Sequence, residues 1–84
     1  MTYAILYEKP ALKFIKKRPR EQQIRILEAI HALPGIGDIK QMKGHSGLFR
    51  LRVGAYRILY TVDNGQLIVR IIDAGNRGQI YNHD

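Results

Sequence analysis

The middle of the chain carries only one sign of charge. Between Ile39 and Val62 there is no Asp or Glu, whereas five residues are basic: Lys40, Lys43, Arg50, Arg52 and Arg57. An arginine side chain stays protonated and donates paired hydrogen bonds to phosphate oxygens. Several such groups without a counter-charge form a candidate phosphate site. The alternative is a solvated strand with independent arginines, and spacing alone leaves both interpretations open.

Groups that could act as metal ligands or redox centres are sparse. The chain has no cysteine, and its three histidines are scattered at His31, His45 and His83. This excludes a disulfide framework and a thiolate metal site, and it argues against an imidazole cluster. We therefore expect neither a metal nor a cofactor.

The residue pattern around the arginines predicts how they are positioned. Phe49, Leu51 and Val53 alternate with Arg50 and Arg52, which is typical of a strand with one buried and one wet face. The Gly54-Ala55 turn then leads into a strand over 56–62 that begins beside Arg57. We expect the three arginines to share the sheet face that helices leave uncovered, with no counter-charge from the protein itself.

The remaining elements follow from changes in period and from turn residues. The sequence predicts a strand over 3–7, a helix from 9 to 18, and a second helix that opens at Pro19 with Ile24, Leu27, Ile30 and Leu33 at helical spacing. Residues 34–37 break this helix, Asp63-Asn64-Gly65 forms a tight turn, residues 66–72 form an inner strand, and 74–84 form a short tail. The predicted fold is α+β, ordered β-α-α-β-β-β, with two helices on one face of a mainly antiparallel sheet.

Length and charge limit the possible functions. The chain has 84 residues and a formal charge of +7, from 14 Lys+Arg against 7 Asp+Glu. We expect one domain over residues 1–84, with its chemistry on an outer face and an affinity for polyanions. The N-terminus lacks a basic signal region and no apolar run is long enough to cross a bilayer, which favours a cytoplasmic protein without a membrane partner.

A second basic run is the other candidate surface. It comprises Lys13, Lys16, Lys17, Arg18 and Arg20. A solvated helix face that keeps a small domain soluble is one interpretation, and a contact surface for nucleic acid is the other.

Several segments together resemble the RelE/ParE superfamily of toxins from toxin–antitoxin pairs. They are Lys43-Gly44, the run from Leu48 to Tyr60, Ala74-Gly75-Asn76-Arg77 and Ile80-Tyr81. Members similar to RelE cut messenger RNA in the ribosomal A site, whereas members similar to ParE inhibit DNA gyrase without enzymatic action. The resemblance implies the first activity, with ParE-like gyrase inhibition as the alternative.

The resemblance also implies roles for individual residues. Arg52, Arg57, Arg77 and Tyr81 would be catalytic, and Lys43, Arg50 and Arg52 would bind RNA. Arginines stand where RelE has lysines on the strand, and an arginine is a poor proton acceptor, so the general base stays open. The chain also stops three residues after Tyr81, so we expect no appended C-terminal helix.

The implied partners match the charge of the chain. They are a cognate acidic antitoxin, the ribosomal A site with its messenger RNA, and operator DNA only as the toxin–antitoxin complex. An antitoxin segment that folds on binding would neutralise the basic surface.

Overall fold

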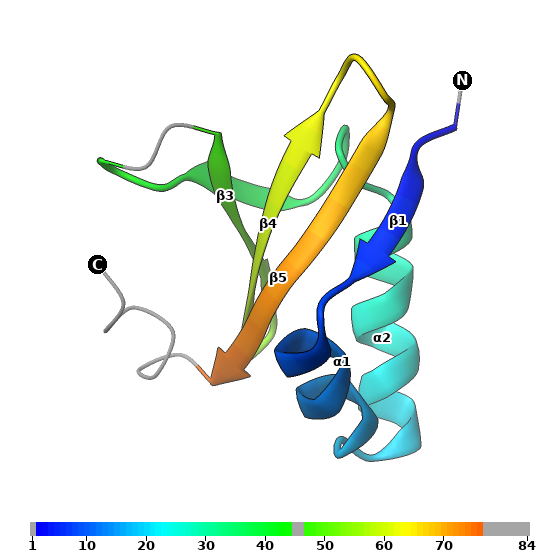
Figure 1. The fold of residues 1–84 in the computed structure, drawn as a ribbon. Coiled ribbons are helices and arrows are strands. Elements are labelled where there is room, and N and C mark those ends of the chain that lie inside the picture. The colour runs from blue at the N-terminus through cyan, green and yellow to red at the C-terminus, as the bar shows by residue number, and fades with distance from the viewer. Residues whose placement is uncertain (1, 45–46, 77–84) are drawn as a thin grey trace.

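The computed structural model describes residues 2–44 and 47–76, which form a helical layer against a five-stranded sheet. In chain order the elements are β1 (Ala4–Tyr7), α1 (Lys9–Lys16), α2 (Arg20–His31), β2 (Asp38–Gln41), β3 (Leu48–Val53), β4 (Tyr56–Asp63) and β5 (Ile68–Asn76). The strand order is β1-β5-β4-β3-β2, with β1 parallel to β5 and every other pair antiparallel. Both helices lie on the same side of the sheet (Figure 1). The expected α+β class and layering are confirmed.

Two prolines set the limits of the helices. Pro10 occupies the first turn of α1, where its missing N–H costs nothing. Pro19 caps the start of α2, so α1 ends at Lys16, slightly before the expected boundary. The side of α1 that faces the sheet carries Ala11 and Ile15, both buried.

The buried face of α2 differs from the expected one. Ile26, Ile30 and the following Leu33 are buried, whereas Ile24 is 47% exposed. Ile24 and Ile26 are two positions apart, about 200° around the helix at 3.6 residues per turn, so their side chains leave α2 on nearly opposite sides. Of the four apolar residues at helical spacing, Ile24 therefore lies outside the buried face.

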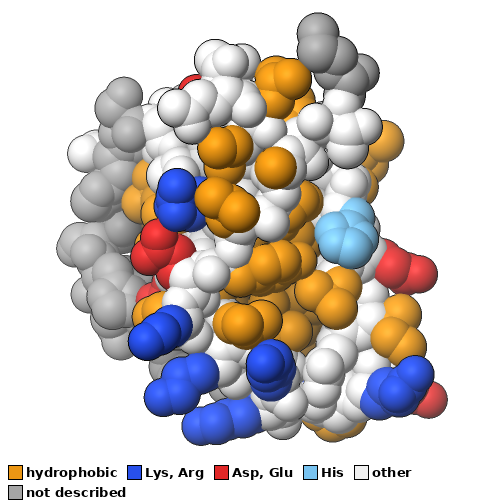
Figure 2. All heavy atoms as spheres, turned by 45° about the vertical axis from the view of Figure 1, so that its right-hand side comes forward, with side chains coloured by type: hydrophobic (Ala, Val, Ile, Leu, Met, Phe, Trp, Pro, Cys, Tyr) orange, Lys and Arg blue, Asp and Glu red, His pale blue; other side chains and the backbone are white. Residues whose placement is uncertain are grey.

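The core lies between the helices and the sheet. Its fully buried strand residues are Leu51 of β3, Ile58 and Tyr60 of β4, and Val69 and Ile71 of β5. Figure 2 turns the helical side toward the viewer and shows apolar side chains in the middle of this face, with Lys and Arg side chains along its lower edge. No helix within residues 2–44 and 47–76 is long and apolar enough to cross a membrane.

Two strand boundaries depart from the sequence prediction. Strand β2 was not predicted. It is an edge strand of four residues in which only Ile39 is half-buried, so its sequence shows no alternation of apolar and polar residues. Strand β5 begins later than expected, at Ile68, and extends through Ala74 and Gly75 to Asn76. The prediction that a tail begins at residue 74 is therefore wrong. Ala74 pairs with Ile58 of β4, so this segment is still part of the sheet.

Candidate functional site

A row of residues crosses the sheet at the end where β4 begins. Arg52 of β3 has Asp38 of β2 as its partner on one side and Arg57 of β4 on the other, and Arg57 in turn is paired with Gly75 of β5. Residues directly opposite one another project to the same face of a sheet. Because Leu51 and Ile58 face the helices, Arg52 and Arg57 face away from them. Arg50 lies on the same face two residues earlier, as expected from the alternation.

Asp38 supplies a counter-charge that was not expected. Its Oδ2 accepts a hydrogen bond from Arg52 Nε at 2.6 Å, and its Oδ1 accepts one from Arg50 Nη2 at 3.4 Å. The expectation that these arginines have no internal counter-charge is therefore wrong. Asp38 stands one residue outside the acid-free stretch, and pairing of β2 with β3 brings it to Arg52.

The three arginines differ strongly in exposure. The side chain of Arg52 is 51% exposed, whereas Arg57 is 4% exposed and Arg50 is also buried. Arg57 Nη1 donates to the backbone oxygens of Gly54 at 3.3 Å and Tyr56 at 3.1 Å. Arg57 thus holds the β3–β4 turn, in addition to placing positive charge beside Arg52.

Aromatic contacts attach this end of β4 to α1. The ring of Tyr56 packs edge to face against Phe14, with centroids 5.7 Å apart. The guanidinium of Arg18 lies over Phe14, 4.1 Å from the ring centre, and Arg18 Nε donates to the backbone oxygen of Phe14. Such contacts restrict the position of the β4 start relative to the helices.

The second basic run lies with the helices and not beside Arg52. Lys13, Lys16, Lys17 and Arg20 are exposed along α1, the connection and the start of α2, whereas Arg18 is half-buried over Phe14. The run is therefore separate from the arginine face.

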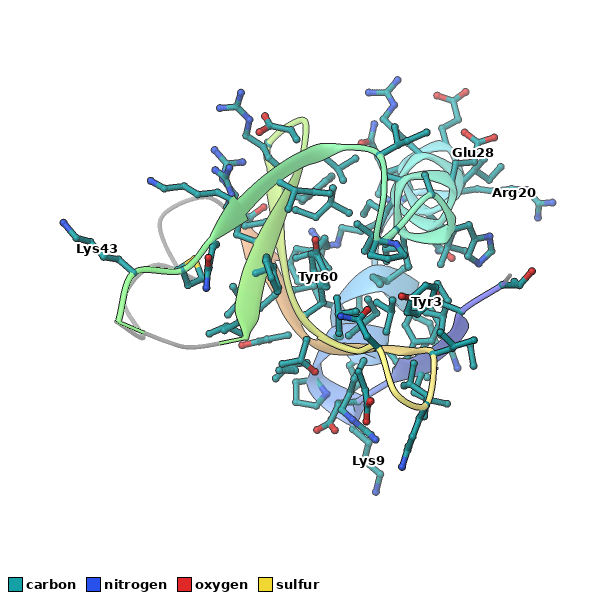
Figure 3. All side chains as sticks on the ribbon, turned by 90° about the horizontal axis from the view of Figure 1, so that it is seen from above. Tyr3, Lys9, Arg20, Glu28, Lys43 and Tyr60 are labelled. Atoms are coloured by element: carbon teal, nitrogen blue, oxygen red, sulfur yellow. The ribbon has the colours of Figure 1, made fainter. Side chains whose placement is uncertain are left out.

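Lys43 is also separate from the Arg52 row. It follows β2, beyond Gln41, whose partner Phe49 lies at the other end of β3 from Arg52. Lys43 points away from the body of the molecule in Figure 3. Strand β2 ends at Gln41, and Lys43 lies in the turn that follows it.

Arg77 and Tyr81 lie outside the described residues, as do His45 and His83. Arg77 directly follows Asn76, the last residue of β5, and Asn76 is paired with Tyr56 beside Arg57. The end of β5 is thus at the same end of the sheet as the Arg52 row.

The described part of the site offers cations, and its carboxylate, Asp38, already accepts hydrogen bonds from Arg52 and Arg50. Burial raises the pKa of Tyr60 to about 12 and also raises the pKa of Tyr7, so both hydroxyls stay protonated near neutral pH. Both tyrosines also pack against the core, away from the arginine face. Among residues 2–44 and 47–76 no three His, Asp or Glu side chains gather as a metal site. This face can bind an anion and stabilise developing negative charge.

Comparison with known proteins relates this chain to toxins of type II toxin–antitoxin systems. A family model described as the ParE toxin of the type II toxin–antitoxin system parDE matches residues 5–81. The RelE–RelB complex of Pyrococcus horikoshii is similar at 26% identity and a TM-score of 0.77, covering 94% of this chain and 99% of the other. That of Methanococcus jannaschii is similar at 28% identity and a TM-score of 0.74, covering 93% and 96%.

A third solved structure extends the likeness in fold. The toxin–antitoxin complex RelBE2 of Mycobacterium tuberculosis is similar at 23% identity and a TM-score of 0.76, covering 92% of this chain and 100% of that one. Comparison with curated protein sequences finds no match.

Proposed function

We propose that this chain, which belongs to the ParE toxin family of type II toxin–antitoxin systems, is a ribosome-dependent endoribonuclease that cuts messenger RNA in the ribosomal A site. The observation that carries this proposal is the exposed guanidinium of Arg52 on a sheet face that also bears Arg50 and Arg57. A phosphodiester is the anion that such a face fits, because arginine binds two phosphate oxygens at once.

The reaction needs charge stabilisation that these arginines can supply. The 2′-oxygen forms a bond to the neighbouring phosphorus, the bond from phosphorus to the 5′-oxygen breaks, the 2′-hydroxyl loses its proton and the 5′-oxygen gains one. Arg52 binds the phosphate, and buried Arg57 adds positive potential where the local dielectric is low. One well-placed donor is worth about 2.7–4 kcal/mol in comparable sites.

Arg77 and Tyr81 complete the proposed site. Arg77 would bind the phosphate or the leaving oxygen, and Tyr81 would orient or activate the 2′-hydroxyl. Tyr81 is five positions after Asn76, the end of β5, so at most about 18 Å of chain joins the two residues. Arg50 supports the phosphate site from the neighbouring position, and Lys43 would bind a phosphate further along the strand.

The scarcity of bases supports dependence on the ribosome. The described residues provide cations for the transition state, and the carboxylate beside them, Asp38, already accepts hydrogen bonds from Arg52 and Arg50, which makes it a poor base for the 2′-proton. A substrate held by the ribosome in the reactive geometry needs less help from the protein, because orientation alone can lower the barrier greatly.

The family also contains the alternative function. A ParE-like toxin would inhibit DNA gyrase by binding, and exposed Arg52 would then be a contact residue. The similar RelE structures of Pyrococcus horikoshii and Methanococcus jannaschii, both above 25% identity, favour the RelE-like activity.

We further propose a cognate acidic antitoxin as the stable partner. Both of these RelE proteins are complexed with RelB. A chain of charge +7 favours an acidic partner, and an antitoxin that covers Arg52 would block the phosphate site. Operator DNA would be bound only by the toxin–antitoxin complex.

Primer extension in a purified translation system tests the proposed activity. We expect cuts in the message only when protein and ribosomes are both present. Tyr81→Phe removes one hydroxyl and should reduce cleavage by about 100-fold or more. Inhibition of gyrase supercoiling by a protein that leaves the ribosome-bound message intact would overturn the nuclease proposal in favour of the alternative.

A further inference from the structure

We propose that Asp38 is an internal substitute for phosphate that occupies Arg52 in the free protein and lowers its affinity for RNA. The inference rests on the proposed function in that it takes an RNA phosphodiester as the ligand of Arg52. It assigns a role to the acidic residue that contacts Arg52.

The geometry of the carboxylate carries the inference. One oxygen of Asp38 accepts from Arg52 at 2.6 Å, and the other accepts from Arg50 at 3.4 Å. A phosphodiester offers two non-bridging oxygens that two arginines can bind in the same way. Asp38 therefore uses the donors that a bound phosphate needs.

The backbone determines the position of Asp38. It is the first residue of β2 and the register partner of Arg52. The preceding Gly37 has φ +143°, and a Cβ there would lie 2.8 Å from Leu51 Cδ1. The close approach of the chain at Gly37 thus brings the carboxylate to the edge of the arginine face.

The exposure of the pair allows it to open. The side chain of Asp38 is 45% exposed and that of Arg52 is 51% exposed. Ion pairs this accessible are weak, so a phosphate held nearby can displace the carboxylate. Free RNA must compete with Asp38 for Arg52. A message held by the ribosome has a high effective concentration at the site, so it can displace the carboxylate.

A binding measurement without cleavage tests this role. The probe is a fluorescein-labelled single-stranded RNA with 2′-O-methyl riboses, which 2′-hydroxyl attack cannot cut, and the readout is fluorescence polarisation. We expect Asp38→Asn to bind this RNA about fivefold more tightly at low salt, the scale of one charge a few ångströms away. The slope of log K against log salt should steepen by about 0.7, as for one further phosphate contact with a single strand.

Glu28→Gln is the matched control. It removes the same charge from an exposed position on α2, and Figure 3 shows Glu28 on the other side of the molecule from Lys43. Asp38→Ala serves as a second variant should the Asn side chain keep the contacts or impair folding. If neither Asp38 variant binds more tightly than Glu28→Gln, the inference is wrong.

A double variant shows whether the effect passes through Arg52. The gain from Asp38→Asn should disappear when Arg52 is already Ala, because the donors that Asp38 occupies are then absent. A gain that persists in Arg52→Ala would reduce Asp38 to a general charge effect and overturn the inference. Tighter RNA binding that depends on Arg52, together with no ribosomal cleavage, would refute the nuclease and leave the role of Asp38 standing.

Discussion

Arg52 and Arg57 are direct partners across β3 and β4, yet one is half exposed and the other is buried. Arg52 donates a hydrogen bond to the Asp38 carboxylate at the edge of the sheet, whereas Arg57 donates to backbone oxygens of the β3–β4 turn. Two neighbouring residues of the same type on one face therefore have different structural roles. Substitutions at these positions should separate binding from folding.

Replacement of Arg52 should affect activity and not stability. Arg52→Ala removes an exposed ion pair, so the free energy of unfolding should change by at most about 0.5 kcal/mol while cleavage of ribosome-bound message falls strongly. The matched control is Arg70→Ala on β5, since the Arg70 side chain is 46% exposed and its 3.4 Å partner Glu8 is 44% exposed. Thermal unfolding and primer extension on the same preparations provide both readouts. Equal loss of cleavage in the two variants would contradict a specific role for Arg52.

Replacement of Arg57 should lower stability. Arg57→Ala removes the donor to Gly54 and Tyr56 and leaves a gap in a buried position, at a cost of about 1–3 kcal/mol. For a domain of this size each kcal/mol lowers the melting temperature by about 4–8 °C. Circular dichroism during heating measures the shift. An unchanged melting temperature would show that the turn does not need this side chain.

Gly37 should be intolerant of a side chain. Gly37→Ala forces a left-handed φ on alanine and puts its Cβ 2.8 Å from Leu51 Cδ1, so we expect a loss of about 1–3 kcal/mol. Gly35→Ala in the same loop is the control, because nothing lies within 4 Å of its added Cβ. Urea unfolding measures both free energies. Similar values for the two variants would mean that β2 can move away from β3 at little cost.

Tyr60 should make stability depend on pH in the alkaline range. Burial raises the pKa of Tyr60 to about 12, against about 10 for an ordinary tyrosine. The folded pKa exceeds the unfolded one, so this contribution is complete below pH 10 and is lost as the pH rises toward 12. Tyr60→Phe keeps the ring that stacks on Phe49 and should flatten this dependence in urea unfolding between pH 9 and 11. Identical slopes for the two proteins would contradict the assignment to Tyr60.

The sequence by itself determined the face of the arginines and the order of most elements. Alternation of Arg50 and Arg52 with apolar neighbours is a local property of a strand, and it predicts that both side chains leave the same face. The prolines before α2 and within α1, and the turn residues after β4, likewise act on their immediate neighbours. These features could be predicted because local backbone geometry alone decides them.

Only the tertiary structure decided which groups meet the arginines. Asp38 reaches Arg52 because β2, a strand with no periodic signal, pairs with β3 in one register. The burial of Arg57 likewise depends on where β5 and the β3–β4 turn lie. Strand pairing joins residues far apart in the chain, so a periodicity read along one segment carries no information about its partner. The positive charge of the site was therefore predictable, whereas its internal counter-charge was not.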